Sequence, residues 1–193
     1  MVRRVQYRVN ILLVWLIQAC SGNKTPEQMP MFNAAHIKVR IENGLLMQNG
    51  QPFTGIIYAL QPNQKDTSEM VCFNHGHEHG VWKRFYPGGK LGEVRYFENG
   101  KKTGRLQGWW PNGKNKLDYQ FKDGEYQGLC REWQADGRLI AAMNYEQGHE
   151  SGHQLQYYSD GKVKANYIII NGRRYGLLGT KNCKNVSDSI FKK

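Results

Sequence analysis

The sequence of 193 residues lacks several of the short motifs around which many catalytic centres are built. It contains no G-x-S-x-G nucleophile elbow and no G-x-x-x-x-G-K-[ST] phosphate loop. No pair of carboxylates stands apart from the repeated pattern described below. Because an enzyme needs unique residues in a cleft, we expect a protein without enzymatic activity and without a cofactor.

Cysteines and long apolar runs are also few. The four cysteines are Cys20, Cys72, Cys130 and Cys183. If Cys20 has a separate role, the other three leave at most one disulfide and one free thiol, and we predict no disulfide. The apolar run at residues 11–17 is much shorter than the roughly 20 residues needed to cross a bilayer. We therefore expect no retained transmembrane helix.

Glycine, in contrast, is abundant and recurs at a fixed spacing of 24 residues. One set is Gly80, Gly104, Gly128, Gly152 and Gly176, a second is Gly76, Gly100, Gly124, Gly148 and Gly172, and a third is Gly89, Gly113, Gly137 and Gly161. Such a period is typical of tandem repeats, in which each unit stacks on its neighbours to bury its apolar side chains. Function is then expected on an extended surface.

Each unit has the pattern of a β-hairpin. Two alternating, aromatic-rich runs are separated by a turn such as Pro87-Gly88-Gly89 or Pro111-Asn112-Gly113, and Asn-Gly or a similar pair closes the unit. Proline, Asn or Asp, and glycine in this order predict a three-residue loop with a glycine bulge. A loop of this length places Phe85 opposite Leu91.

This register predicts that odd-numbered residues of both strands share one face. That face would hold most apolar side chains and would need covering by sheet curl, by the terminal segments or by another chain. Val81, Phe85, Leu91, Phe97, Trp109, Phe121, Trp133, Tyr145 and Tyr157 belong to it. The even face would be exposed. It would present charged residues together with the candidate ligand-binding aromatics Trp82, Tyr86, Tyr96, Trp110 and Tyr158, although cross-strand stabilisation of the hairpins explains each of them as well.

The recurring G-x-W/x-x-x-aromatic-aromatic-x-x-G-K pattern, closed by N/D-G-x-x-x-G, resembles the bacterial variant of the MORN repeat over about residues 44 to 179. The resemblance implies an all-β fold, an elongated single-layer antiparallel sheet of tandem 24-residue β-hairpins. Proteins of this type often carry the label of YwqK-type antitoxins. Choline-binding repeats are the alternative, since they are also aromatic hairpins, whereas the L-x-x-L-x-L of leucine-rich repeats is absent.

The N-terminus has the order of a secretory signal. Arg3, Arg4 and Arg8 precede the apolar run, and residues 17–20 read I-Q-A-C. This ending resembles a bacterial lipobox, which implies lipidation of Cys20, a membrane partner through the lipid anchor, and an outer-membrane location in the cell envelope. A buried N-terminal strand with an incidental cysteine is the alternative.

These boundaries divide the chain into four parts. They are a signal peptide at 1–19, a tether at 20–34, a repeat domain at 35–179 and a basic tail at 180–193. Without the three arginines of the signal, 24 basic residues face 16 acidic ones, a net charge of +8. Such a charge attracts anionic surfaces, but the basic residues lie mainly in links and tail, where solvated loops explain them. We expect no nucleic-acid partner.

One cluster of possible metal ligands occurs, formed by His75, His77 and His79. On an extended strand their side chains would share a face, as a zinc or copper site requires. The same repeat positions hold unrelated residues in the other units, which indicates a variable surface link, and we predict no metal.

The resulting hypothesis is a non-enzymatic module that binds or scaffolds a protein of unknown identity. A toxin-neutralising protein and a binder of carbohydrate or choline are the alternatives.

Overall fold

The computed structural model describes residues 29–179, which form strands, turns and irregular segments. The described residues contain no helix that is long and apolar enough to cross a membrane. The strands are β1 (Met31–Asn33), β2 (Arg40–Glu42), β3 (Leu45–Gln48), β4 (Gln51–Pro52), β5 (Gly55–Leu60), β6 (Thr67–Asn74), β7 (His77–Phe85), β8 (Leu91–Glu98), β9 (Lys101–Trp109), β10 (Asn115–Lys122), β11 (Glu125–Tyr126), β12 (Gly128–Trp133), β13 (Leu139–Glu146), β14 (His149–Tyr157), β15 (Val163–Ile170) and β16 (Arg173–Leu177).

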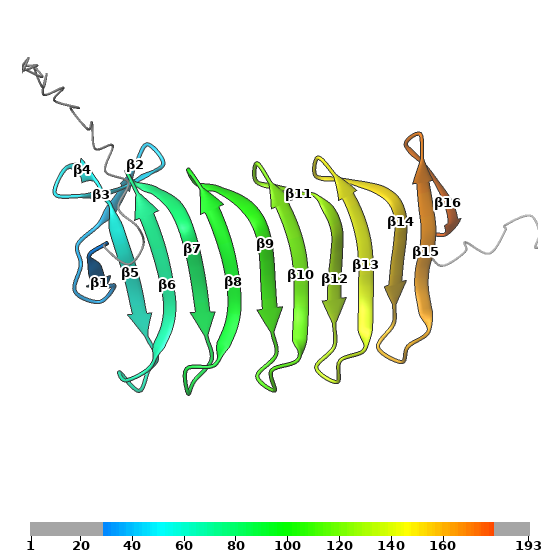
Figure 1. The fold of residues 1–193 in the computed structure, drawn as a ribbon, viewed down its shortest axis with the longest axis horizontal. Helices are drawn as coiled ribbons and strands as arrows, with labels where there is room; N and C mark the ends of the chain where they lie inside the picture. Colours follow the sequence, from blue (N-terminus) through cyan, green and yellow to red (C-terminus); the bar gives the residue numbers. More distant parts are fainter. Residues whose placement is uncertain (1–28, 180–193) are drawn as a thin grey trace, which may run out of the picture.

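Strands β5 to β16 lie side by side in chain order and form one long sheet (Figure 1). All their pairings are antiparallel, and the short β11 pairs with the end of β10, before β12 pairs further along the same strand. β1 adds to the first edge in parallel with β5, so the sheet has 13 strands. The predicted fold class, an elongated single-layer antiparallel sheet of 24-residue hairpins, is therefore confirmed, with β1 as the parallel exception.

The hairpin turns have the predicted length of three residues. The Tyr86 N–H donates to the Lys90 carbonyl, and the Gly89 N–H donates to the Tyr86 carbonyl. The same two bonds recur in the next three hairpins, for example from Trp110 to Lys114 and from Gly113 to Trp110. Phe85 pairs with Leu91, as expected from this loop length.

The links between hairpins are two-residue turns with both residues at positive φ, the geometry of a type I′ turn. Asn99 and Gly100 have φ of 48° and 79°, and His75 and Gly76 have 48° and 81°. The Asn99-Gly100 link also bonds to the strand that follows the preceding link, because the Gly100 N–H donates to the Glu78 carbonyl at 2.8 Å. The Gly124 and Gly148 amides repeat this bond one and two units later, which stacks the links along the sheet.

The predicted sorting of side chains by odd number is wrong, because one extra residue follows every hairpin turn. Phe85 pairs with Leu91, but Arg84 pairs with Glu93, which leaves Gly92 unpaired as a β-bulge. The other hairpins shift at equivalent positions. Even-numbered residues of the first strand therefore share a face with odd-numbered residues of the second. The buried apolar side chains of β7 to β15 lie on this shared face, and Val94 on the opposite face is the exception.

The beginning of the array also differs from the expectation. Residues 31–33, placed in the tether from the sequence, form β1 and join the main sheet at β5. A hairpin with its turn at Asn43-Gly44 precedes the main sheet, and its strands β2 and β3 form a separate small sheet with β4. The Leu46 N–H donates to the Gly76 carbonyl at 2.9 Å, which fastens this small sheet to the first link. Residues 1–28 and the predicted tail at 180–193 lie outside the described part of the chain.

Candidate binding face

One face of the sheet carries a continuous row of paired residues, which we use to define it. The row runs across β7 to β15 and consists of Arg84, Glu93, Gly108, Leu117, Glu132, Ala141, Gln156 and Ala165, each the Cα partner of the next. We call this side the inner face and the opposite side the outer face. Buried residues of the inner face include Trp82, Leu106, Cys130 and Gln154, which occupy the same position in four successive units.

A first cluster of charged and aromatic residues lies on β7 and β8. Glu93, which is only 7% exposed, forms two ion pairs. Arg84 Nη2 lies 2.6 Å from its Oε2, and Arg95 Nη2 lies 2.5 Å from its Oε1. The Arg95 guanidinium also lies 3.8 Å from the ring centroid of Trp82. A buried carboxylate is costly unless it is paired, and here two arginines of the chain neutralise it. One of these arginines stacks on the neighbouring aromatic ring.

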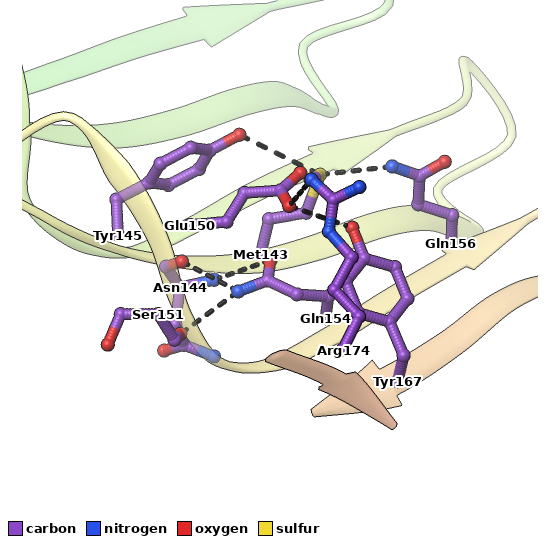
Figure 2. Close-up of polar contacts among 9 residues, drawn as sticks. All are labelled: Met143, Asn144, Tyr145, Glu150, Ser151, Gln154, Gln156, Tyr167 and Arg174. Atoms are coloured by element: carbon purple, nitrogen blue, oxygen red, sulfur yellow. Dashed lines mark hydrogen bonds and ion pairs between the residues drawn. The ribbon is translucent and has the colours of Figure 1, made fainter. Parts of the chain in front are cut away.

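A second cluster of the same kind lies at the C-terminal end, on β14 to β16 (Figure 2). The Tyr167 hydroxyl donates to Glu150 Oε2 at 3.0 Å, and Arg174 donates to the same oxygen at 2.8 Å. The Arg174 guanidinium is 5.6 Å from the Tyr167 ring centroid. An arginine of the chain therefore pairs with the carboxylate and lies near the aromatic ring in this cluster as well.

A third cluster lies between these two, on β10 to β13. Tyr126 stacks on Tyr145 with ring centroids 5.0 Å apart and meets the edge of Tyr119 at 5.6 Å. The Tyr119 hydroxyl donates to Glu132 Oε1. These residues, with Cys130, Ala141 and Met143, line a hollow of about 90 Å³. We call Tyr119, Tyr126, Tyr145 and Glu132 the tyrosine cluster.

Burial shapes the chemistry of the tyrosine cluster. Desolvation, followed by the hydrogen bond to Glu132, raises the pKa of Tyr119 far above its ordinary value. Burial also raises the pKa of Tyr126 and Tyr145. The phenols therefore stay protonated across the physiological range, and Tyr119 donates a hydrogen bond rather than accepting one. Among residues 29–179 no Lys, Arg or His forms an ion pair with Glu132.

Next to the tyrosine cluster, Gln154 is fully buried and bonds to the backbone (Figure 2). Its Nε2 donates to the Asn144 carbonyl at 2.7 Å and to the Ser151 carbonyl at 2.9 Å, and its Oε1 accepts the Asn144 N–H at 3.2 Å. The pairing of β13 with β14 is interrupted at Asn144. Gln154 therefore replaces the missing strand partner of that residue.

The five aromatics proposed from the sequence do not form one site. Trp82 is 7% exposed and lies on the inner face under Arg95, contrary to the predicted exposed even face. The Tyr86 hydroxyl and the Trp110 Nε1 donate to the carbonyls of Trp109 and Trp133 in the following hairpins, each at 3.0 Å. Tyr96, 44% exposed, lies on the outer face, and Tyr158, 49% exposed, follows β14.

The histidines proposed as metal ligands lie in or next to a link between hairpins. His75 occupies a link turn, and His79 Nδ1 accepts the Asn99 N–H of the next link at 3.4 Å. Residues 149–153 read H-E-S-G-H, which matches H-E-x-x-H in spacing, but that zinc motif requires a helix and these residues lie on β14. Within the described range no three or more His, Cys, Asp or Glu side chains lie together so that they could hold a metal ion, and this applies to His75, His77 and His79 as well.

The cysteines have separate positions. Cys72 and Cys130 are buried free thiols on β6 and β12, and burial raises the pKa of each. Cys20, the predicted lipidation site, and Cys183 lie outside the described residues.

The sequence did not predict the tyrosine cluster. Sorting residues by odd and even number placed Tyr126 and Glu132 on one face and Tyr119 and Tyr145 on the other.

Comparison with known proteins gives no family. No family model matches this sequence, and no curated protein matches it. The fold is similar to part of one chain in the crystal structure of accessory secretory protein 1, 2 and 3 in Streptococcus pneumoniae, with 13% identity and a TM-score of 0.18. The similarity covers 71% of this chain and 20% of that chain, so this chain spans about a fifth of its length. A likeness at this level carries no argument about function.

Proposed function

We propose that this chain is a MORN-variant repeat protein that binds a protein partner across its inner face and performs no catalysis. The observation that carries the proposal is the inner face itself. Its aromatic and charged side chains run across β7 to β16, and the small sheet of β2 to β4 lies at the N-terminal end of the array (Figure 1). Aromatic residues and arginine are enriched in the cores of protein interfaces, and stacked repeats commonly use such extended surfaces.

The proposal includes a lipid anchor at Cys20, which would hold the array at the outer membrane of a bacterial envelope. The support is the order of arginines, apolar run and I-Q-A-C in residues 1–20. A YwqK-type antitoxin would use the same face without an anchor. Palmitate labelling distinguishes these cases, because a Cys20→Ala variant with unchanged processing and location would exclude the anchor.

Site-specific photocrosslinking tests the binding face. A photoreactive phenylalanine analogue is placed at Tyr126 on the inner face or at Tyr96 on the outer face, and the full chain is expressed in bacteria. The two tyrosines are a matched pair, since they are 37% and 44% exposed. We expect one discrete adduct from position 126 and none from position 96. Equal adducts from both positions, or none from position 126, would contradict the proposal.

A further inference from the structure

The three clusters of the inner face differ in one respect, the presence of a cation. In the first cluster Arg84 and Arg95 pair with Glu93, and in the last Arg174 pairs with Glu150. The tyrosine cluster has the same components, a carboxylate beside aromatic rings, but no basic residue within the described chain pairs with Glu132. An acidic and aromatic site of this composition attracts a cation through both charge and ring quadrupole.

The repeat explains why this cation is missing. Met143 stands two units after Arg95 in the same repeat position, and Tyr126 stands two units before Arg174 in another. The positions of Arg95 and Arg174 are therefore uncharged in the middle of the array, and the position of Arg84 holds Glu132 itself. Met143 and Tyr126 instead line the hollow beside Glu132.

We propose that the tyrosine cluster binds the guanidinium group of an arginine side chain from a protein partner. This inference rests on the proposed function and names the chemistry of its central contact. A guanidinium donates hydrogen bonds to a carboxylate and stacks on an aromatic face. Arg95 does both, since its Nε and Nη2 meet Glu93 Oε1 and its guanidinium lies over the Trp82 ring. The hollow of about 90 Å³ suits the head of one side chain rather than a larger ligand.

The geometry of the cluster fits this role. The Tyr119 hydroxyl donates a hydrogen bond to Glu132 Oε1, and no protein donor among the described residues bonds to Glu132 Oε2. Tyr126 is 37% exposed and lies between the rings of Phe121 and Tyr145, which hold it in place. The bound guanidinium would pair with Glu132 and contact the tyrosine rings that line the hollow.

Titration of the ¹⁵N-labelled full chain with N-acetyl-arginine amide, followed by NMR, tests the proposal. N-acetyl-citrulline amide is the neutral control of the same shape, and choline is the competing cation. We expect saturable shifts at Tyr126 and Glu132 with the arginine compound and at least tenfold weaker binding of citrulline and choline. Equal binding of citrulline, preferential binding of choline, or no saturable shift would each overturn the proposal.

Two variants locate the site. Glu132→Gln removes the charge, and Met143→Arg supplies an internal guanidinium at the position that corresponds to Arg95. Both are expected to weaken arginine binding at least tenfold, whereas Glu98→Gln, an exposed change on the outer face, leaves it unchanged. Unchanged binding in both inner-face variants would overturn the proposal. If the Tyr126 crosslink persists while arginine fails to bind, this inference falls and the proposed function stands.

Discussion

At the scale of single residues, Gln154 shows how the sheet accommodates an interruption. The Asn144 N–H and carbonyl point to β14 but have no backbone partner there, because the register shifts between Met143 and Tyr145. The Gln154 amide bonds to both groups from a fully buried position. A buried polar side chain is stabilising only when its hydrogen bonds are complete, and those of Gln154 are.

We therefore predict that Gln154→Leu is strongly destabilising although the volumes are similar. The substitution leaves the Asn144 N–H and carbonyl without a partner, and an unpaired buried polar group costs about 1–3 kcal/mol. The free energy of unfolding from urea denaturation should fall by about 2 kcal/mol or more. Gln156→Leu is the control, because the Gln156 side chain hydrogen-bonds to the Met143 sulfur rather than to the backbone, and its loss should cost less than about 1 kcal/mol. Equal effects of both changes would refute this role.

At the scale of elements, neighbouring hairpins are joined beside their turns by one repeated side-chain contact. Gln61, Tyr86 and Trp110 occupy equivalent places after the first strand of their units, and each donates to a backbone carbonyl of the following hairpin. The chemistry differs at each position, but the geometry is the same. Tyr158 occupies this place in the last complete hairpin and forms no such bond within residues 29–179.

This difference gives a matched pair of substitutions. Tyr86→Phe deletes the hydroxyl that bonds to the Trp109 carbonyl and should lower the free energy of unfolding by about 0.5–1.5 kcal/mol, the usual net value of a hydrogen bond. Tyr158→Phe deletes the same group at the end of the array and should have no measurable effect. Thermal and urea unfolding of the two variants, side by side, measure the difference. A loss in Tyr158→Phe as large as in Tyr86→Phe would contradict the contact.

At the scale of the whole molecule, burial along the sheet couples stability to pH. Six cysteine and tyrosine side chains have a pKa raised mainly by burial, namely Cys72, Cys130, Tyr119, Tyr126, Tyr145 and Tyr167. The ordinary pKa is 9.0 for the thiols and 10.0 for the phenols. As the pH rises, the unfolded chain loses these protons before the folded chain does.

The free energy of unfolding should therefore be constant with respect to these groups below about pH 8 and should fall as the pH rises from about 8.5 to 11. Each group contributes a slope of at most about 1.4 kcal/mol per pH unit. Urea denaturation at several pH values measures the profile. Replacing Cys72 and Cys130 with alanine should move the onset of the loss upward by about one pH unit. A stability that is flat or rising between pH 8.5 and 10.5 would contradict this prediction.

Local turn chemistry could be predicted from the sequence, whereas the choice of face could not. The Pro-Gly-Gly and Asn-Gly pairs specify loop length and positive φ within a few residues, so the hairpins and links follow from them directly. The extra residue at Gly92 and its equivalents has no comparable signal, because Lys116, Ile140 and Lys164 occupy the same place in later units. One unpaired residue inverts every side chain beyond it. The tyrosine cluster was missed for this reason.

By itself, the sequence determined the repeat, its 24-residue period, the turn types and an all-β single-layer sheet, because these depend on residues close together in the chain. The tertiary structure decided which side chains share a face and that β1 joins the sheet in parallel. It also decided that Glu132 and three tyrosines line one hollow, with no arginine of residues 29–179 paired to Glu132. These features depend on strand register and on contacts between units. Spacing along the chain does not encode either of them.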